Sequence, residues 1–117
     1  MESASEAASI DEVQLMENMA GCRDILAEAG AIFLEDVGEM LASLEAAVAS
    51  RDARATERAA HLIKGAFLSL AAPTAARLAS SIERTARSGE LAIPDSVRAL
   101  GGEVERVRTA LLRIMKA

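Results

Sequence analysis

The chain has 117 residues, a formal net charge of −5, one histidine, one cysteine and only two aromatic side chains. A lone cysteine cannot form an internal disulfide, and one histidine with one cysteine cannot build a zinc site of the Cys/His type. The acidic balance and the scarcity of aromatic residues argue against a nucleic-acid-binding surface. The length suits a single domain with one core.

Nothing in the sequence indicates a membrane span or an export signal. No stretch reaches the run of about 18 apolar residues that a spanning helix needs. The first residues, MESASEAAS, are acidic and lack the positively charged start of a secretory signal. We expect a cytoplasmic protein with a lead-in of small and polar residues over 1–8, one domain over 9–117, and no membrane partner.

A short helix is predicted first. Ser9 and Glu12 have the spacing of a capping box, which places the start of the helix at Ser9 and its end at about Met19. Gly21 then interrupts the pattern. The residues expected on the apolar face of this helix are Ile10, Val13 and Met16.

A long helix is predicted from about Cys22 to Ser50, because apolar residues recur there at steps of three and four, the period of a helix. These residues are Leu26, Ala29, Phe33, Val37, Met40, Leu44 and Val48. The residues Ser50-Arg51-Asp52 predict a tight connection to a second long helix over about 53–71. The apolar stripe of that second helix consists of Ala59, Ile63, Ala66, Phe67 and Leu70.

Two prolines mark the remaining helix starts. Pro73 ends the preceding helix and opens another that runs to about Ser88, with Gly89 at its C-terminal cap. Pro94 and Asp95 open the last helix. The residues expected to face inward are Leu78, Ala79, Ile82 and Ala86 in the first of these helices, and Val97, Leu100, Val104, Val107, Leu111 and Ile114 in the second.

Four long amphipathic helices, short connections and no strand signal predict an all-α fold. We expect an antiparallel up-down four-helix bundle with an additional short N-terminal helix. Four helices can close their own core, so a monomer is the expected state.

The only histidine, His61, falls outside the apolar stripe of its helix. With a rotation of about 100° per residue it lies about 160° from Ile63, so it points away from the core. Gly65 leaves room for a group that approaches the imidazole, and Lys64 can place an ammonium beside an anion held on the ring. Leu68 is an apolar residue on this outer face. A surface histidine without a chemical role is the alternative interpretation.

The surroundings of this histidine favour a docking surface. Residues 51–87 carry seven basic and three acidic side chains, a net charge of +4, whereas residues 1–50 carry −10 and residues 88–117 carry +1. Such a basic segment would attract an acidic partner and tolerate a phosphoryl group. Solvated helix faces with charge pairs would explain part of the same pattern. The residues predicted to form the docking surface are Glu57, Arg58, Leu68, Ala72 and Ala76.

Residues 59–66, AAHLIKGA, resemble the A-H-x-L-K-G-[SA] signature of histidine-containing phosphotransfer (HPt) domains. The resemblance covers roughly residues 10–115 and extends to stretches similar to the family's helix positions. These stretches include IFLED over 32–36, LASL over 41–44, LASSIE over 78–83 and the turn RSGEL over 87–91.

The resemblance implies a role for three residues. His61 would be the phosphoaccepting histidine, Lys64 the phosphate-supporting lysine, and Gly65 the residue that opens room beside the ring. The chain departs from the family's pattern at Phe67 and Leu68, where small residues or glycine are frequent. It also departs at Ala71, where glycine is frequent. Phe67 lies on the predicted core stripe, so we expect it to alter packing rather than chemistry.

The function expected from this resemblance is that of a phosphoryl carrier in a two-component multistep phosphorelay. The imidazole would take the phosphoryl group from an aspartyl phosphate on one receiver domain and return it to the aspartate of another. The implied partners are response-regulator receiver domains and a histidine kinase or hybrid kinase. The chain has no ATP or metal site of its own, so it is expected not to be an enzyme, and Mg²⁺ would belong to the receiver. Arg58 is a weaker candidate than Lys64 to offset phosphoryl charge, and Glu57 is a candidate to orient the ring.

Two other functions stay open from the sequence. The bundle could serve as a non-catalytic helical adaptor that only docks signalling proteins. Alternatively, it could be an HPt piece that a kinase module phosphorylates directly. A hydrolase is remote, because the chain lacks a triad motif, a metal site and convincing paired carboxylates.

Overall fold

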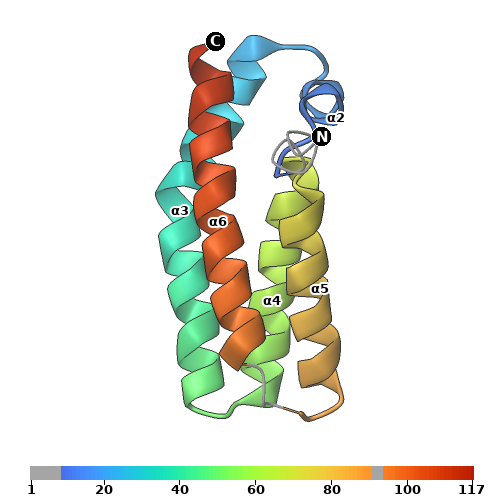
Figure 1. The fold of residues 1–117 in the computed structure, drawn as a ribbon, viewed down its shortest axis with the longest axis vertical. Helices are drawn as coiled ribbons and strands as arrows, with labels where there is room; N and C mark the ends of the chain where they lie inside the picture. The colour runs from blue at the N-terminus through green and yellow to red at the C-terminus, as the bar shows by residue number, and fades with distance from the viewer. Residues whose placement is uncertain (1–8, 91–93) are drawn as a thin grey trace.

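The computed structural model describes residues 9–90 and 94–117, and this part of the chain is built of helices. Helix α2 spans Glu12–Asn18, α3 spans Arg23–Ala49, α4 spans Ala53–Ser69, α5 spans Pro73–Arg87 and α6 spans Pro94–Lys116. The four long helices lie side by side, and α2 lies beside the end of the bundle where α4 meets α5 (Figure 1). The prediction of an all-helical bundle is confirmed, while the predicted lead-in over 1–8 lies outside the described residues. Among the described helices, none combines the length and apolar character needed to span a bilayer.

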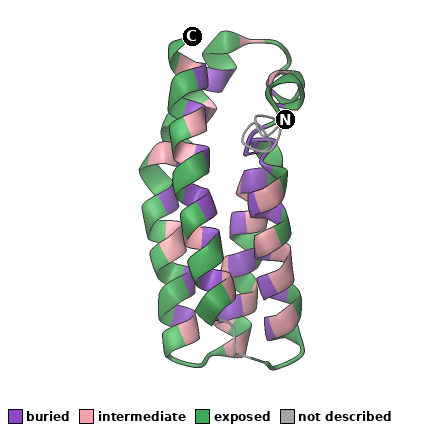
Figure 2. Ribbon diagram, viewed as in Figure 1, coloured by how far each residue is buried: buried purple, intermediate pink, exposed green. Residues whose placement is uncertain are grey.

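The core forms where the inward faces of the long helices meet. Helix α4 packs against α3 on one side and α5 on the other, and α6 packs against the same two helices. Figure 2 shows the buried residues on these inward faces. Phe67 of α4 is fully buried and meets Phe33 of α3 edge to face, with ring centroids 5.4 Å apart. This aromatic pair fixes α4 against α3, as expected for a packing residue.

The apolar periods predicted for the long helices hold in most positions. All six residues predicted to face inward in α6 are buried. In α4 the buried stripe contains Ile63 and Phe67, and it continues into the C-cap residue Leu70. It also includes Ala60, which was not predicted to be buried. Ala59 and Ala66 lie half-buried at the edges of that stripe.

Helix α2 begins later than predicted. Its N-cap is Asp11 rather than Ser9, and the Asp11 carboxylate accepts a hydrogen bond from the backbone N–H of Gln14 at 3.1 Å. Val13 is 72% exposed instead of packed, because the helix turns the face that carries Leu15 toward the core. Leu15 takes the buried position in its place.

Helix α2 is attached to the end of α4. The backbone N–H of Asp11 donates to the carbonyl of Ala71 at 2.8 Å, and the Asn18 side-chain amide donates to the carbonyls of Leu68 and Ser69. The carbonyls of Leu68 and Ser69 belong to the last turn of α4, where carbonyls lack partners within the helix, and Ala71 follows that turn. The short helix therefore caps the C-terminal end of α4.

The connection from α4 to α5 requires an unusual backbone conformation. Ala71 has φ of +57°, in the left-handed region, and the N–H of Ala72 returns to the carbonyl of Phe67 at 2.9 Å. This is the closing pattern in which glycine is the common residue at the left-handed position. Ala71 therefore retains the turn while carrying the strain of a side chain there.

Candidate functional site

His61 lies on the outer face of α4, as the helical period predicts. Its side chain is 66% exposed, whereas Ala60 before it and Ile63 after it are buried. The buried neighbours anchor the backbone of this turn in the core. The imidazole is therefore held on a rigid helix while one side of it faces solvent.

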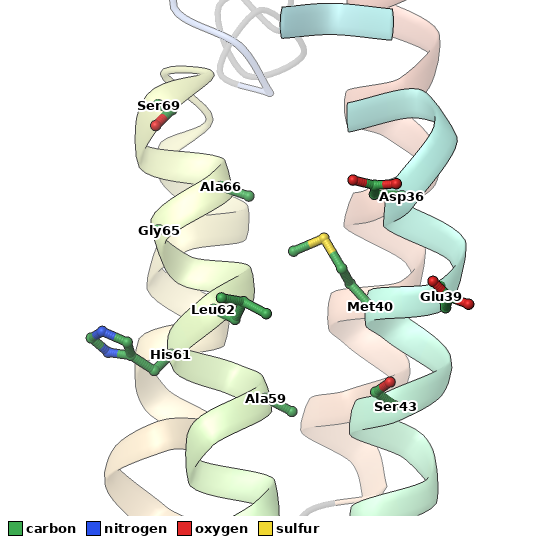
Figure 3. A pocket seen from close by; sticks show the side chains of 10 residues that line it. All are labelled: Asp36, Glu39, Met40, Ser43, Ala59, His61, Leu62, Gly65, Ala66 and Ser69. Carbon is green, nitrogen blue, oxygen red and sulfur yellow. The ribbon is translucent and has the colours of Figure 1, made fainter. Parts of the chain in front are cut away.

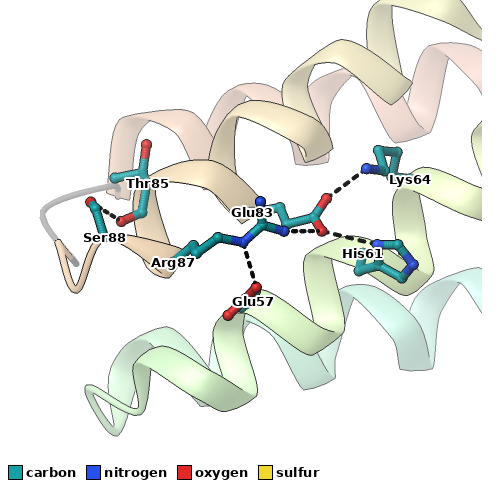
Figure 4. A network of polar contacts seen from close by, with 7 residues as sticks. All are labelled: Glu57, His61, Lys64, Glu83, Thr85, Arg87 and Ser88. Carbon is teal, nitrogen blue, oxygen red and sulfur yellow. Dashed lines mark hydrogen bonds and ion pairs between the residues drawn. The ribbon is translucent and has the colours of Figure 1, made fainter.

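A buried carboxylate on α5 holds the ring from the other side. His61 Nδ1 lies 2.9 Å from Oε2 of Glu83, whose side chain is only 5% exposed (Figure 4). Glu83 follows Ile82 and lies one turn from Ala79 and Ala86, so it shares the edge of the inward face of α5. The packing of α5 against α4 brings this edge to His61.

The sequence reading missed Glu83 and proposed Glu57 as the residue that orients the ring. In the structure, Glu57 accepts a hydrogen bond from Arg87 Nε at 2.7 Å instead, so that part of the prediction is wrong. The signal for Glu83 was present, since an acidic residue interrupts an otherwise apolar face. Its partner could not be read from the sequence, because the pairing depends on how α4 and α5 are aligned.

The same carboxylate binds two cationic side chains. Lys64 Nζ lies 2.8 Å from Glu83 Oε1, and Arg87 Nη2 donates to Glu83 Oε2 at 2.9 Å. Lys64 is one turn after His61 and half-buried, so the predicted phosphate-supporting lysine lies beside the ring. One continuous polar network therefore crosses from α4 to α5 (Figure 4). It consists of Glu57, Arg87, Glu83, Lys64 and His61.

The network keeps Glu83 ionised and sets the tautomer of the ring. The hydrogen bond from Lys64 is the largest influence lowering the pKa of Glu83; burial works against it and the hydrogen bond from His61 adds to it. A carboxylate only accepts hydrogen bonds, so the His61 nitrogen that faces it must carry a proton. In a neutral ring the proton then lies on Nδ1, and the lone pair of Nε2 is left free.

The space next to His61 is open. A Cβ atom added to Gly65 would meet no other atom within 4 Å, apart from its own helix backbone and chain neighbours. The packing of the protein therefore gives no reason for a glycine in the middle of α4, where glycine lowers helix stability.

The predicted docking surface is only partly exposed. Leu68 is 58% exposed and Arg58 is exposed, but Ala72 and Ala76 are only 1% and 5% exposed. Ala72 is the N-cap residue of α5, and Ala76 lies in the core cluster, so neither alanine can line a docking surface. An apolar side chain that the prediction omitted, Leu62, is 64% exposed and follows His61 directly.

Two hollows flank the ridge that carries His61. The hollow between α3 and α4 has a volume of about 850 Å³, and its α3 side includes Asp36, Glu39 and Met40. In Figure 3, Leu62 and Met40 point toward each other across it, while the imidazole of His61 points away from α3. The hollow between α4 and α5 has a volume of about 650 Å³. It is lined by Arg54, Glu57, Arg58, His61, Leu62, Glu83 and Arg87.

Comparison with known proteins agrees with this geometry. Residues 28–111 match the family model described as the Hpt domain. The match covers more than half of the chain and includes the whole of α4 and α5, and so every residue of the network around His61. Neither the curated proteins nor the solved structures gave a match to the chain. On the family match, the chain belongs to the Hpt domain family, whose members are phosphocarriers that take part in histidine phosphotransfer in phosphorelay signalling.

Proposed function

We propose that this protein carries a phosphoryl group on Nε2 of His61 between the aspartates of receiver domains. The observation that supports the proposal best is the contact of His61 Nδ1 with Glu83, because it leaves the Nε2 lone pair free on an exposed ring. A nucleophile in this position can be reached by the active site of another protein.

The transfer needs little from this chain beyond position and charge. The Nε2 lone pair attacks the phosphorus of an aspartyl phosphate, the bond from phosphorus to the aspartate oxygen breaks, and the aspartate leaves as a carboxylate. The ring then carries a positive charge shared between its nitrogens, with Nδ1 still protonated. In the return step, the carboxylate of a second receiver attacks the phosphorus, the N–P bond breaks and Nε2 regains its lone pair.

Glu83 acts in this proposal as a positioning residue. Its carboxylate holds the proton on Nδ1 and stabilises the positive charge that forms on the ring during attack. Burial strengthens this interaction, because a nearby charge is screened less where water is excluded. Glu83 is 4% exposed and the ring is 66% exposed, so water reaches the contact from the side of the ring only.

Lys64 supplies the positive charge for the phosphoryl oxygens. An ammonium has three N–H donors, so Lys64 can keep its contact with Glu83 and still donate to an anion on the neighbouring ring. Arg58 is farther along the same exposed surface and is the secondary source of positive charge.

The partners in this proposal are response-regulator receiver domains and a histidine kinase or hybrid kinase. The receiver brings its own Mg²⁺, and this chain contributes no ATP or metal site. The protein works as a cytoplasmic monomer, in which four long helices in antiparallel up-down order close one core.

Transfer from a phosphorylated receiver tests the proposal. The purified protein is mixed with receiver domains carrying ³²P-labelled aspartyl phosphate, and the acid-labile label on this chain is measured. Because the chain has a single histidine, His61→Gln should abolish the label while the helical content stays unchanged. Equal labelling of the variant and the natural protein would refute the proposal.

Two further arms of the same experiment separate the other functions. Label that arrives only from a kinase module with ATP, and never from a receiver, would assign the protein to direct phosphorylation by a kinase. Receiver binding without any labelling would make the protein an adaptor. The proposal predicts receiver-dependent labelling, and it predicts that His61→Gln still binds the receiver.

A further inference from the structure

The exposed ridge of α4 changes its chemical character along its length. Arg54, Arg58, His61, Gly65 and Leu68 follow one another at steps of four, three, four and three residues, so they share one face of the helix. All five are exposed. The guanidinium groups of Arg54 and Arg58 therefore lie on the N-terminal side of His61. On its C-terminal side lie Gly65, which has no side chain, and the apolar side chain of Leu68.

Negatively charged side chains lie on the neighbouring helix α3, across the hollow from the exposed ridge of α4. Asp36 and Glu39 are exposed on α3 and line the hollow that also contains His61 and Leu62. In Figure 3, Asp36 lies level with Ala66 and Glu39 level with Leu62, beside the middle and C-terminal half of α4. The basic pair lies in the other direction along α4, toward its N-terminus. His61 thus lies between an acidic flank and a basic flank.

These four charges are available to a partner. Within the described residues, none of these four side chains forms an ion pair; they are Asp36, Glu39, Arg54 and Arg58. The neighbouring Glu57 and Arg87 differ, because they are paired with each other. A partner that brings opposite charges to them does not need to break an existing ion pair.

We propose that the surface around His61 is charge-polarised and fixes the orientation in which a receiver domain docks. The receiver places acidic side chains against Arg54 and Arg58 and at least one basic side chain against Asp36 and Glu39. An apolar segment of the receiver covers Leu62. This inference rests on the proposed phosphotransfer function and adds which kind of surface the partner must present.

Simple attraction between net charges makes a different prediction. This chain has a net charge of −5, so attraction between net charges alone would favour a less negative variant for any acidic receiver. If only net charge mattered, Asp36→Lys with Glu39→Lys would make the protein less negative and accelerate docking. A polarised contact predicts slower docking for that variant, because its partner is a basic side chain.

The test compares two double charge reversals. One variant carries Asp36→Lys and Glu39→Lys, and the other carries Arg54→Glu and Arg58→Glu. The probe is a phosphorylated receiver domain that labels the natural protein, chosen by screening the receivers of the same organism. The second-order rate of transfer is measured at low salt and in 0.5 M NaCl.

Matched controls remove the effect of total charge. Glu17→Lys with Glu105→Lys gives the same change in charge as the acidic-flank variant, and Arg98→Glu with Arg113→Glu matches the basic-flank variant. All four control positions are exposed; Glu105, Arg98 and Arg113 lie on α6, which does not neighbour α4, and Glu17 lies on α2 and lines neither hollow beside His61. The ion pairs that Glu105, Arg98 and Arg113 form lie at the surface, where such pairs contribute little to stability. Each rate is divided by the labelling rate of the same variant with phosphoramidate, a donor too small to bridge both flanks.

The inference predicts that both flank variants transfer about tenfold more slowly than their controls at low salt, and that the difference shrinks in 0.5 M NaCl. If either flank variant is as fast as its control, or faster, the inference is overturned. That result is distinct from failure of the proposed function, in which the natural protein itself takes no label from any receiver. Such a failure would remove both proposals.

Discussion

Nδ1 of His61, on the exposed face of α4, lies 2.9 Å from a carboxylate oxygen of Glu83, which is buried at the edge of α5. This contact connects the exposed ring to a carboxylate at the edge of the buried core. It also determines which ring nitrogen is free, because a carboxylate can only accept from Nδ1–H. The chemistry proposed for His61 therefore depends on a residue 22 positions away in the sequence.

Replacing Glu83 by glutamine should slow transfer about tenfold, which corresponds to the loss of one charge-assisted contact in the transition state. A neutral amide can accept from or donate to Nδ1, so the ring should also lose its preference for the Nδ1–H tautomer. The tautomer is measured by the ¹⁵N chemical shifts of the His61 ring, and the rate by labelling with phosphoramidate.

Glu103→Gln is the matched control for Glu83→Gln. Glu103 is also 4% exposed and is paired with Arg106 at 2.7 Å, but it lies on α6, which does not neighbour α4. The Glu103 variant should leave both the transfer rate and the ring tautomer unchanged. An equal loss of rate in both variants would mean that Glu83 acts only through stability.

Acid should weaken the fold through Glu83. Because the native contacts lower the pKa of Glu83 from its ordinary value near 4.5, its contribution to stability is present above about pH 4.5 and is lost as the pH falls through the lower native value. The free energy of unfolding is measured by urea denaturation between pH 7 and pH 3. The difference between the natural protein and Glu83→Gln should shrink on the acid side of this range, and a constant difference would contradict the assignment.

Gly65→Ala should stabilise the protein and impair its function. The substitution removes a mid-helix glycine, which is worth about 0.5–1 kcal/mol, and the new Cβ meets no atom of the fold within 4 Å. The same methyl group intrudes where a receiver must approach His61. Thermal unfolding and the transfer rate are measured together. Gly38→Ala is the control, because a Cβ there is equally free and Gly38 does not line either hollow beside His61.

Ala71→Gly should raise stability by about 1 kcal/mol, because the backbone already adopts φ of +57° and glycine has no side chain to strain there. Ala42→Gly, at an exposed position inside α3, should lower stability by about 0.5–1 kcal/mol. If urea denaturation shows a gain in the free energy of unfolding for Ala71→Gly and a loss for Ala42→Gly, then the backbone conformation at each position decides how glycine changes stability. A loss of stability at both positions would argue against the strained turn.

The features that the sequence predicted correctly are those that follow from the helical period within one segment. The exposure of His61 and the burial of all six inward residues of α6 needed only the period and the prolines. Glu83 was missed because its role depends on the alignment of two helices. Ala72 and Ala76 were misplaced although the start of α5 at Pro73 was predicted correctly, because their burial depends on how α5 packs against its neighbours. Val13 was misplaced for a similar reason, because the face that α2 turns inward depends on how this short helix docks on the end of α4.

The position of the phosphoryl group on the ring decides whether Nε2 of His61 is the nucleophile. The protein is labelled with ¹⁵N at its histidine, phosphorylated by a receiver domain, and examined by ³¹P and ¹⁵N NMR at neutral pH. We expect a phosphorus bonded to Nε2 of His61, with Nδ1 still protonated beside Glu83. Phosphorus on Nδ1, or a phosphorylated protein with an unmodified histidine, would contradict this expectation.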